Sequence, residues 1–181
     1  MVQPAVSTVS RRAKMMANQM LVEVWHEAGF PVDPVTIAKR LGIHVLETDL
    51  PDPIAGALLK ESGKDPIIVI HYEDSNQRKR FTCAHELGHY SWRVAEGTTG
   101  GEYNYVDLRD GPDPSRQDDE NRFADEFAAN LLMPASELSR LQRQGESMLS
   151  AMVYFGVSEA VLAYRLKVLN ISPDAFVRRY R

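Results

Sequence analysis

The sequence predicts an α+β fold in which a small β-sheet packs on a central helix and a small helical unit follows. Residues 43–72 contain three aliphatic runs separated by short turns, as strands do. The segments on both sides place apolar residues at helical spacing. Hydrophobic residues make up 44% of the 181 residues and charged residues 25%, which is the composition of a globular chain with a core of ordinary size.

The elements follow in a simple order. We expect helices over 11–28 and 34–41, with Asp33 capping the second and Pro34 opening it. Strands are expected at 43–50, 54–61 and 66–72, with the last two forming an antiparallel hairpin. After them we expect a helix over 77–95, a long loop over 96–119, helices over 118–132 and 136–143, and two helices within 148–169. This order divides the chain into a main domain, residues 1–135, and a helical C-terminal unit, residues 136–181.

Charge and cysteine content narrow the function classes. The formal net charge of −4 disfavours a dedicated nucleic-acid binder, so we do not expect direct DNA binding. The single cysteine, Cys83, cannot form an internal disulfide, which suits a reducing compartment. The chain has neither an apolar run of membrane-spanning length nor the apolar core of a signal peptide at its N-terminus. We therefore expect a cytoplasmic protein with no membrane partner.

One expected helix carries the motif HELGH, His85 to His89. Histidines four apart lie on one helix face and can share one Zn²⁺ ion. Glu86 projects beside that position, where it can take a proton from a water that the metal activates and pass it to the leaving amine. The alternative is an ordinary helix with partly buried histidines. The preceding hairpin favours the zinc site, because zincin folds place the motif helix after strands.

The third metal ligand has to come from another element. In the extended metzincin motif a glycine and a histidine follow, but Trp92 and Ala95 occupy those positions here. The helix over 118–132 has an apolar face that Glu120 continues by one turn, whereas Glu126 lies off it. A carboxylate on a buried face needs a partner, so we expect Glu120 to be the third ligand.

Three further residues are candidates for contact with substrate or with the tetrahedral oxyanion: His71, Tyr103 and Tyr105. The alternatives are a hydrogen-bonded histidine and packed loop aromatics. The strand PIIVIH could pair with an extended substrate by strand addition. The C-terminal helices have helix-turn-helix spacing around Gly156, but the second offers only Arg165 and Lys167 against Glu159, so we expect packing or substrate docking there.

The phrases RFTCAHELGHY and ADEFAANLLMP resemble the ImmA/IrrE family of zinc metallopeptidases. The resemblance extends to PVDPVTIAKRLGIHV, GALLKESGKDPIIVIH and FGVSEAVLAYRLKVLNI, in the family's order. It implies a zincin-like fold with His85 and His89 as metal ligands, Glu86 as the catalytic residue and one Zn²⁺ per chain. The family's third ligand is a glutamate in the pattern Glu-x-x-Ala-(Asp/Asn)-x-Phe-Ala. When Ala124 to Ala128 are aligned on this pattern, Asn121 occupies the ligand position, and Glu120 lies one residue early, a rotation of about 100°.

The resemblance also implies a substrate. Members of the family typically cut a helix-turn-helix transcriptional repressor encoded beside them and so release its target genes. We therefore expect a site-specific zinc endopeptidase that acts on such a repressor. Two alternatives stay open. One is a weak or inactive regulatory module that binds a repressor or a toxin–antitoxin partner without cleavage, which the Asn121 position favours. The other is a DNA-binding regulator, which the acidic charge disfavours.

Overall fold

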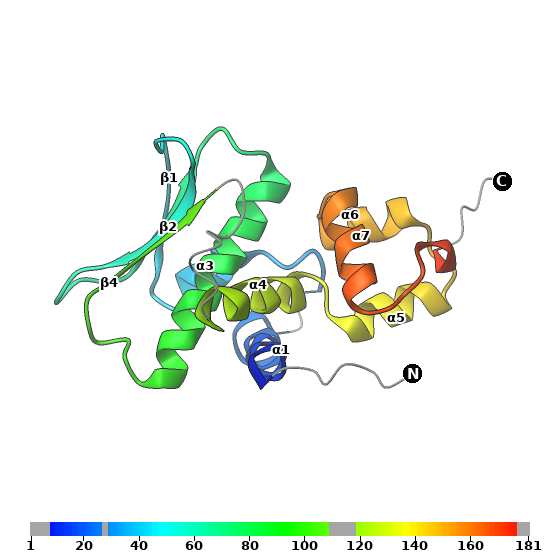
Figure 1. The fold of residues 1–181 in the computed structure, drawn as a ribbon, viewed down its shortest axis with the longest axis horizontal. Coiled ribbons are helices and arrows are strands. Elements are labelled where there is room, and N and C mark those ends of the chain that lie inside the picture. Colours follow the sequence, from blue (N-terminus) through cyan, green and yellow to red (C-terminus); the bar gives the residue numbers. More distant parts are fainter. Residues whose placement is uncertain (1–7, 27–28, 109–118, 177–181) are drawn as a thin grey trace.

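The computed structural model describes residues 8–26, 29–108 and 119–176 and has the predicted α+β architecture (Figure 1). Its helices are α1 (Thr8–Met20), α2 (Pro34–Arg40), α3 (Asn76–Glu96), α4 (Asp119–Leu132), α5 (Ala135–Arg143), α6 (Met148–Phe155) and α7 (Glu159–Val168), with a π-helical turn η1 (Leu21–Trp25) and a 3₁₀ turn η2 (Pro173–Ala175). Its strands are β1 (His44–Thr48), β2 (Ile54–Lys60), β3 (Ile67–His71) and β4 (Tyr103–Leu108). None of the helices described has the length and apolar character needed to cross a membrane.

The four strands form one mixed sheet in the order β1-β3-β2-β4. β2 and β3 pair antiparallel with Leu58 opposite Ile68, so the predicted hairpin is confirmed. β1 runs parallel to β3 on its other side. Because both edges of β3 are paired, the prediction that this strand adds a substrate strand is wrong. The strands at the edges of the sheet are β1 and β4.

The prediction of one long loop over residues 96–119 is wrong for residues 103–108, which form β4 beside β2. Tyr103 is buried and Asn104 is exposed, which is the alternation of a strand that faces the core on one side. Glycines just before this stretch broke the pattern in the sequence and concealed it. Residues 109–118 of the predicted loop lie outside the described part of the chain.

The motif helix α3 lies at the centre of the main domain. Ser75 caps its first turn by accepting a hydrogen bond from the Arg78 amide, and Gly97 ends it in the left-handed conformation with φ 68°. The sheet covers one side of α3, while α4 packs on another side, and α1 packs on α4 (Figure 1). A Cβ atom on Gly88 would lie 2.6 Å from the Ala124 Cα atom, so this glycine permits the close approach of α3 and α4.

The first helix differs from its predicted extent. α1 begins at Thr8 and changes at Leu21 into the π-helical turn, whereas one α-helix was expected over 11–28. The Arg40 guanidinium, from the end of α2, donates hydrogen bonds to the carbonyls of Val24 (2.6 Å) and Trp25 (3.2 Å). These bonds satisfy acceptors at the end of the turn, where backbone carbonyls lack partners within the helix.

The C-terminal helices α5, α6 and α7 gather to one side of α4 (Figure 1). α5 begins at Ala135, next to the boundary placed at 135/136 from the sequence. Two arginines join this unit to the site helices. Arg80 of α3 donates to the carbonyls of Phe155, Gly156 and Val32. Its pKa is lowered because it is buried.

The second of these arginines, Arg165, comes from α7 and is 3% exposed. It donates to the Asn130 side-chain oxygen (2.6 Å) and the Met133 carbonyl (3.2 Å), both at the C-terminal end of α4. Burial also lowers the pKa of Arg165. A guanidinium so enclosed is not available to a DNA phosphate or base. One of the two basic residues that a reading helix could have used therefore has a structural role.

Candidate metal centre

The three motif residues lie in the buried middle of α3. His85 is 5% exposed, His89 3% and Glu86 0%. The two imidazole rings lie edge to face, with centroids 4.9 Å apart and an angle of 71° between their planes. This arrangement brings the two Nε2 atoms to 3.1 Å from each other. The helical spacing therefore directs both rings to one point.

Each histidine has a carboxylate at its other nitrogen. His85 Nδ1 lies 3.0 Å from Asp125 Oδ1, and His89 Nδ1 lies 3.4 Å from Glu120 Oε1. An ionised carboxylate only accepts hydrogen bonds, so Nδ1 is the nitrogen that carries the proton on each ring. The lone pair of each ring is therefore on Nε2. Carboxylates in this outer position orient histidine ligands in many zinc sites.

The pair of Nε2 atoms has the geometry of two ligands to one zinc ion. The two lone pairs point to one position, where a single cation can accept both. Two nitrogens bound tetrahedrally at 2.0–2.1 Å are about 3.3 Å apart. The histidines thus fit a zinc ion. Within residues 8–26, 29–108 and 119–176, no group of three His, Cys, Asp or Glu side chains is arranged to hold a metal.

Glu86 faces β2, where the strand has a glycine. A Cβ atom on Gly56 would lie 2.4 Å from the Thr82 Cγ2 atom and 3.6 Å from Glu86 Oε1. The glycine therefore lets the β2 backbone approach α3 beside the carboxylate. Cys83, on the same helix, is fully buried, and burial raises the pKa of its thiol. It is a packing residue, as small buried cysteines usually are.

Tyr105 of β4 covers one face of His89. The two rings are stacked, with centroids 4.4 Å apart and an angle of 16° between their planes. The Tyr105 hydroxyl lies near Glu120 without the geometry of a good hydrogen bond. Burial raises the pKa of Tyr105, and Glu120 adds to this effect. Burial also raises the pKa of Tyr103 to about 12.

The ionisation of Glu120 reflects its neighbours. Burial alone would raise its pKa, but His89, Tyr105 and the positive charge of Arg93 together outweigh that effect and lower it. Glu120 is therefore a carboxylate at neutral pH, as its contact with His89 Nδ1 requires. Its oxygen meets Nδ1, not the pair of Nε2 atoms, so its coordination of zinc stays a prediction.

The structure brings most of the candidate residues together and separates one. His85, Glu86, His89, Glu120 and Tyr105 share one site, and the Tyr103 ring lies 6.1 Å from the Tyr105 ring. The contacts of His71 are with residues outside this site. Its Nδ1 accepts a hydrogen bond from the Glu73 amide at 3.2 Å, and its Nε2 lies 3.5 Å from Asp49 Oδ1. A role for His71 in substrate contact stays a prediction.

Sequence reasoning assigned no role to Asp125 and Arg93. Asp125 is the carboxylate partner of His85, and Arg93 places its guanidinium carbon 5.0 Å from the Tyr105 ring centroid. Asp125 follows the buried Ala124 at the edge of the apolar face of α4, and that position was a signal of proximity to α3. Arg93 is four residues after His89, which places it one turn further along the same helix face.

Comparison with protein families identifies a match. The model of the M78 peptidase family, described as an IrrE N-terminal-like domain, matches residues 38–167. The matched segment contains the sheet, the motif helix, α4 and the helices as far as α7. It runs across the boundary at 135/136. No curated protein matches the chain.

Proposed function

The chain belongs to the IrrE N-terminal-like family of M78 peptidases, and from that premise we propose that it is a zinc endopeptidase that cleaves a helix-turn-helix transcriptional repressor. The observation that carries the proposal is the pair of Nε2 atoms 3.1 Å apart, each on a ring whose Nδ1 faces a carboxylate. Two converging nitrogen ligands, each oriented by a carboxylate at the other ring nitrogen, are the arrangement of histidines that share a zinc ion. We place this activity in the cytoplasm, in keeping with the single buried cysteine.

His85 and His89 would hold the zinc ion through Nε2. A zinc ion bound there supplies Lewis acidity and lowers the pKa of a water molecule to about 7. Glu86, one residue from His85 on α3, is the group that receives the proton from the attacking water. It then returns that proton to the nitrogen of the leaving amine. The enclosure of Glu86 between α3 and β2 keeps its carboxylate in one position for both transfers.

The third ligand is either Glu120 or Asn121. Glu120 is a carboxylate, the better ligand by chemistry, but it has to leave His89 Nδ1 to coordinate. Asn121 occupies the ligand position in the family pattern and would bind through its amide oxygen. The variants Glu120→Gln and Asn121→Ala distinguish the two when zinc affinity is measured. A glutamine still accepts a hydrogen bond from Nδ1, so a loss well beyond the about 10-fold expected for an outer carboxylate indicates direct coordination.

A second candidate function is a regulatory module that binds its repressor or a toxin–antitoxin partner without cutting it. The observation that favours it is that the described residues bring two nitrogen ligands together but no third acidic, histidine or cysteine ligand. Such a module would retain partner binding in the absence of metal. The two functions therefore differ in what Glu86 does, because a binding module has no use for a base.

The experiment uses the full chain, its zinc content and the repressor encoded beside its gene. We expect about one zinc per chain and a single cut in the repressor. Glu86→Gln should abolish the cut while zinc stays bound. Glu96→Gln is the matched control, because Glu96 ends the same helix and pairs with Arg12 at 2.7 Å, away from the histidines. A repressor that stays intact with zinc-loaded wild-type protein, but binds it, would establish the regulatory module instead.

A further inference from the structure

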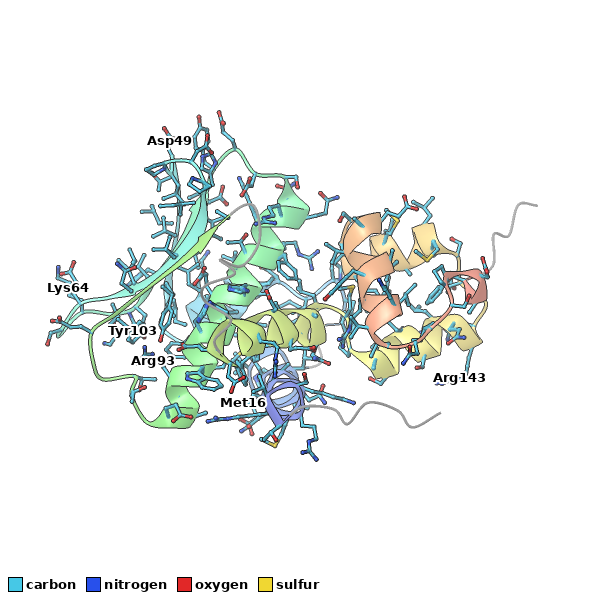
Figure 2. The ribbon with its side chains drawn as sticks, viewed as in Figure 1. Met16, Asp49, Lys64, Arg93, Tyr103 and Arg143 are labelled. Carbon is cyan, nitrogen blue, oxygen red and sulfur yellow. The ribbon has the colours of Figure 1, made fainter. Side chains whose placement is uncertain are left out.

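A cation and two aromatic rings lie beside the metal centre. Tyr103 and Tyr105 come from β4, on the same face of the strand, and Arg93 comes from α3, one turn beyond His89. Figure 2 shows Arg93 and Tyr103 next to each other where β4 faces α3. The Arg93 guanidinium carbon is 5.4 Å from the Tyr103 ring centroid and 5.0 Å from that of Tyr105. Both distances are within the range of cation–π attraction.

The Tyr105 ring limits the freedom of His89. An imidazole on a helix can rotate about its terminal torsion, which has a broad energy profile. The parallel ring of Tyr105 at 4.4 Å blocks rotation on one face, and the edge-to-face contact with His85 restricts the ring from another direction. The stack therefore helps to hold Nε2 toward His85 and Nδ1 toward Glu120.

Arg93 holds the Tyr105 ring in that position. β4 is an edge strand, paired with β2 on one side, so contact with α3 must keep its side chains in place. The Arg93 Nε atom is buried and has no hydrogen-bond acceptor among the described residues. Attraction to the two ring faces and to the nearby Glu120 carboxylate is what accounts for the position of this cation.

We propose that Arg93 and Tyr105 are positioning residues of the metal centre: Arg93 fixes the Tyr105 ring, and that ring fixes the His89 imidazole with Nε2 directed at the metal. This proposal rests on the proposed function in one respect, that the site binds zinc. It does not require that a repressor be cut. It gives Tyr105 a different role from the oxyanion contact expected from the sequence. It also holds whichever of Glu120 and Asn121 is the third ligand.

The same helix provides a comparison for simple packing. Arg12 of α1 lies 4.8 Å from the Trp92 ring centroid and pairs with Glu96 at 2.7 Å, so it too joins α3 to another element through a cation–π contact. Arg12 has no contact with the histidines among those the structure describes. Arg12→Met is therefore a matched control for Arg93→Met, because both remove one cation that makes cation–π contact between α3 and a neighbouring element.

The experiment measures zinc affinity by competition with a chromophoric chelator, and His89 tautomers in the metal-free chain by long-range ¹⁵N–¹H NMR. Tyr105→Leu and Arg93→Met should weaken zinc binding about 10-fold or more, as loss of outer residues of metal sites does. Both should also mix the His89 tautomers. Tyr105→Phe keeps the stack and Arg93→Lys keeps a cation, so each should restore most of the affinity. Arg12→Met should change thermal stability alone.

The outcomes separate the two proposals. Wild-type zinc affinity, within about twofold, together with an unchanged His89 tautomer in Tyr105→Leu and Arg93→Met would overturn the positioning roles, even if the repressor is cut. Weakened zinc binding in these variants, with a repressor that wild-type protein never cuts, would support the positioning roles and reject the peptidase. A wild-type chain that binds no zinc would overturn both.

Discussion

At the N-terminal end of α4, Glu120 and Asp125 face two histidines of α3, whereas at its C-terminal end Asn130 and the Met133 carbonyl receive an arginine from α7. Both ends bury polar groups, but they differ in where the positive charge comes from. The C-terminal end has its own cation in Arg165. The other end has Arg93 beside Glu120, but its two converging histidine nitrogens are suited to a further cation from outside the chain.

The difference explains why one helix can be both a scaffold and part of a site. A buried cation that is hydrogen-bonded by its own chain fixes one arrangement and is costly to disturb. The metal centre instead leaves its polar atoms arranged for a bound ion. The C-terminal unit thus holds α4 in register from one end, while the other end carries the candidate metal centre.

The largest effect should come from the end that provides its own cation. Arg165→Met keeps the apolar stem but leaves the Asn130 oxygen and the Met133 carbonyl without their donor. We expect a loss of about 3 kcal/mol in the free energy of unfolding, measured by urea denaturation. Arg143→Met is the control, because Arg143 lies exposed on the outer side of the C-terminal unit (Figure 2). A loss no larger than the control's would mean that this end of α4 does not depend on the arginine.

The next effect concerns the contact that aligns the two helices. In Gly88→Ala, the new Cβ would lie 2.6 Å from a backbone atom of Ala124, which cannot move aside as a flexible side chain can. Overpacking of about 3 kcal/mol, offset by about 1 kcal/mol of helix propensity, gives a net loss of about 2 kcal/mol in stability. Zinc affinity should also fall, because α4 carries both carboxylates. Gly100→Ala has no neighbour within 4 Å and should change neither.

Strong local patterns made the motif helix and the β2–β3 hairpin predictable. His85, Glu86 and His89 follow from the helical period, and Leu58 and Ile68 from two dense aliphatic runs. β4 was missed because its two-residue alternation is short and follows a glycine-rich stretch. Packing against β2, not local propensity, makes it a strand.

The carboxylates that contact the histidines were harder to predict than the histidines themselves. One residue along a helix is a rotation of about 100°, so the choice between Glu120 and Asn121 depends on how α4 is placed against α3. That placement is a tertiary property, set by Gly88 and by the buried arginine 45 residues after Glu120. Asp125 lies 40 residues from His85 in the sequence. Its side chain is half-exposed, so the apolar pattern of the helix did not indicate that it contacts a buried histidine.

A smaller effect should come from Asp125 itself. Asp125→Asn keeps an oxygen that can accept from His85 Nδ1 but removes the negative charge that strengthens the bond. Zinc affinity should fall about 10-fold, with little change in stability because the side chain is 49% exposed. Asp119→Asn, on the same helix and paired with Arg122 at 3.7 Å, should leave zinc affinity unchanged. Equal affinities for the two variants would remove Asp125 from the metal centre.

The smallest effect concerns the second basic residue of α7. Lys167 is exposed, two residues from the enclosed Arg165, so the pair differs in burial but not in sign of charge. Lys167→Ala should change the free energy of unfolding by less than about 0.5 kcal/mol, since surface substitutions usually do. If the C-terminal unit docks protein and does not read DNA, Lys167→Ala should also leave retention on duplex DNA at low salt unchanged. A drop in DNA affinity with a shallower salt dependence would show that α7 contacts phosphate, because each such contact releases counterions. It would then be the exposed charge that gives this unit its function, with the buried charge serving to hold it in place.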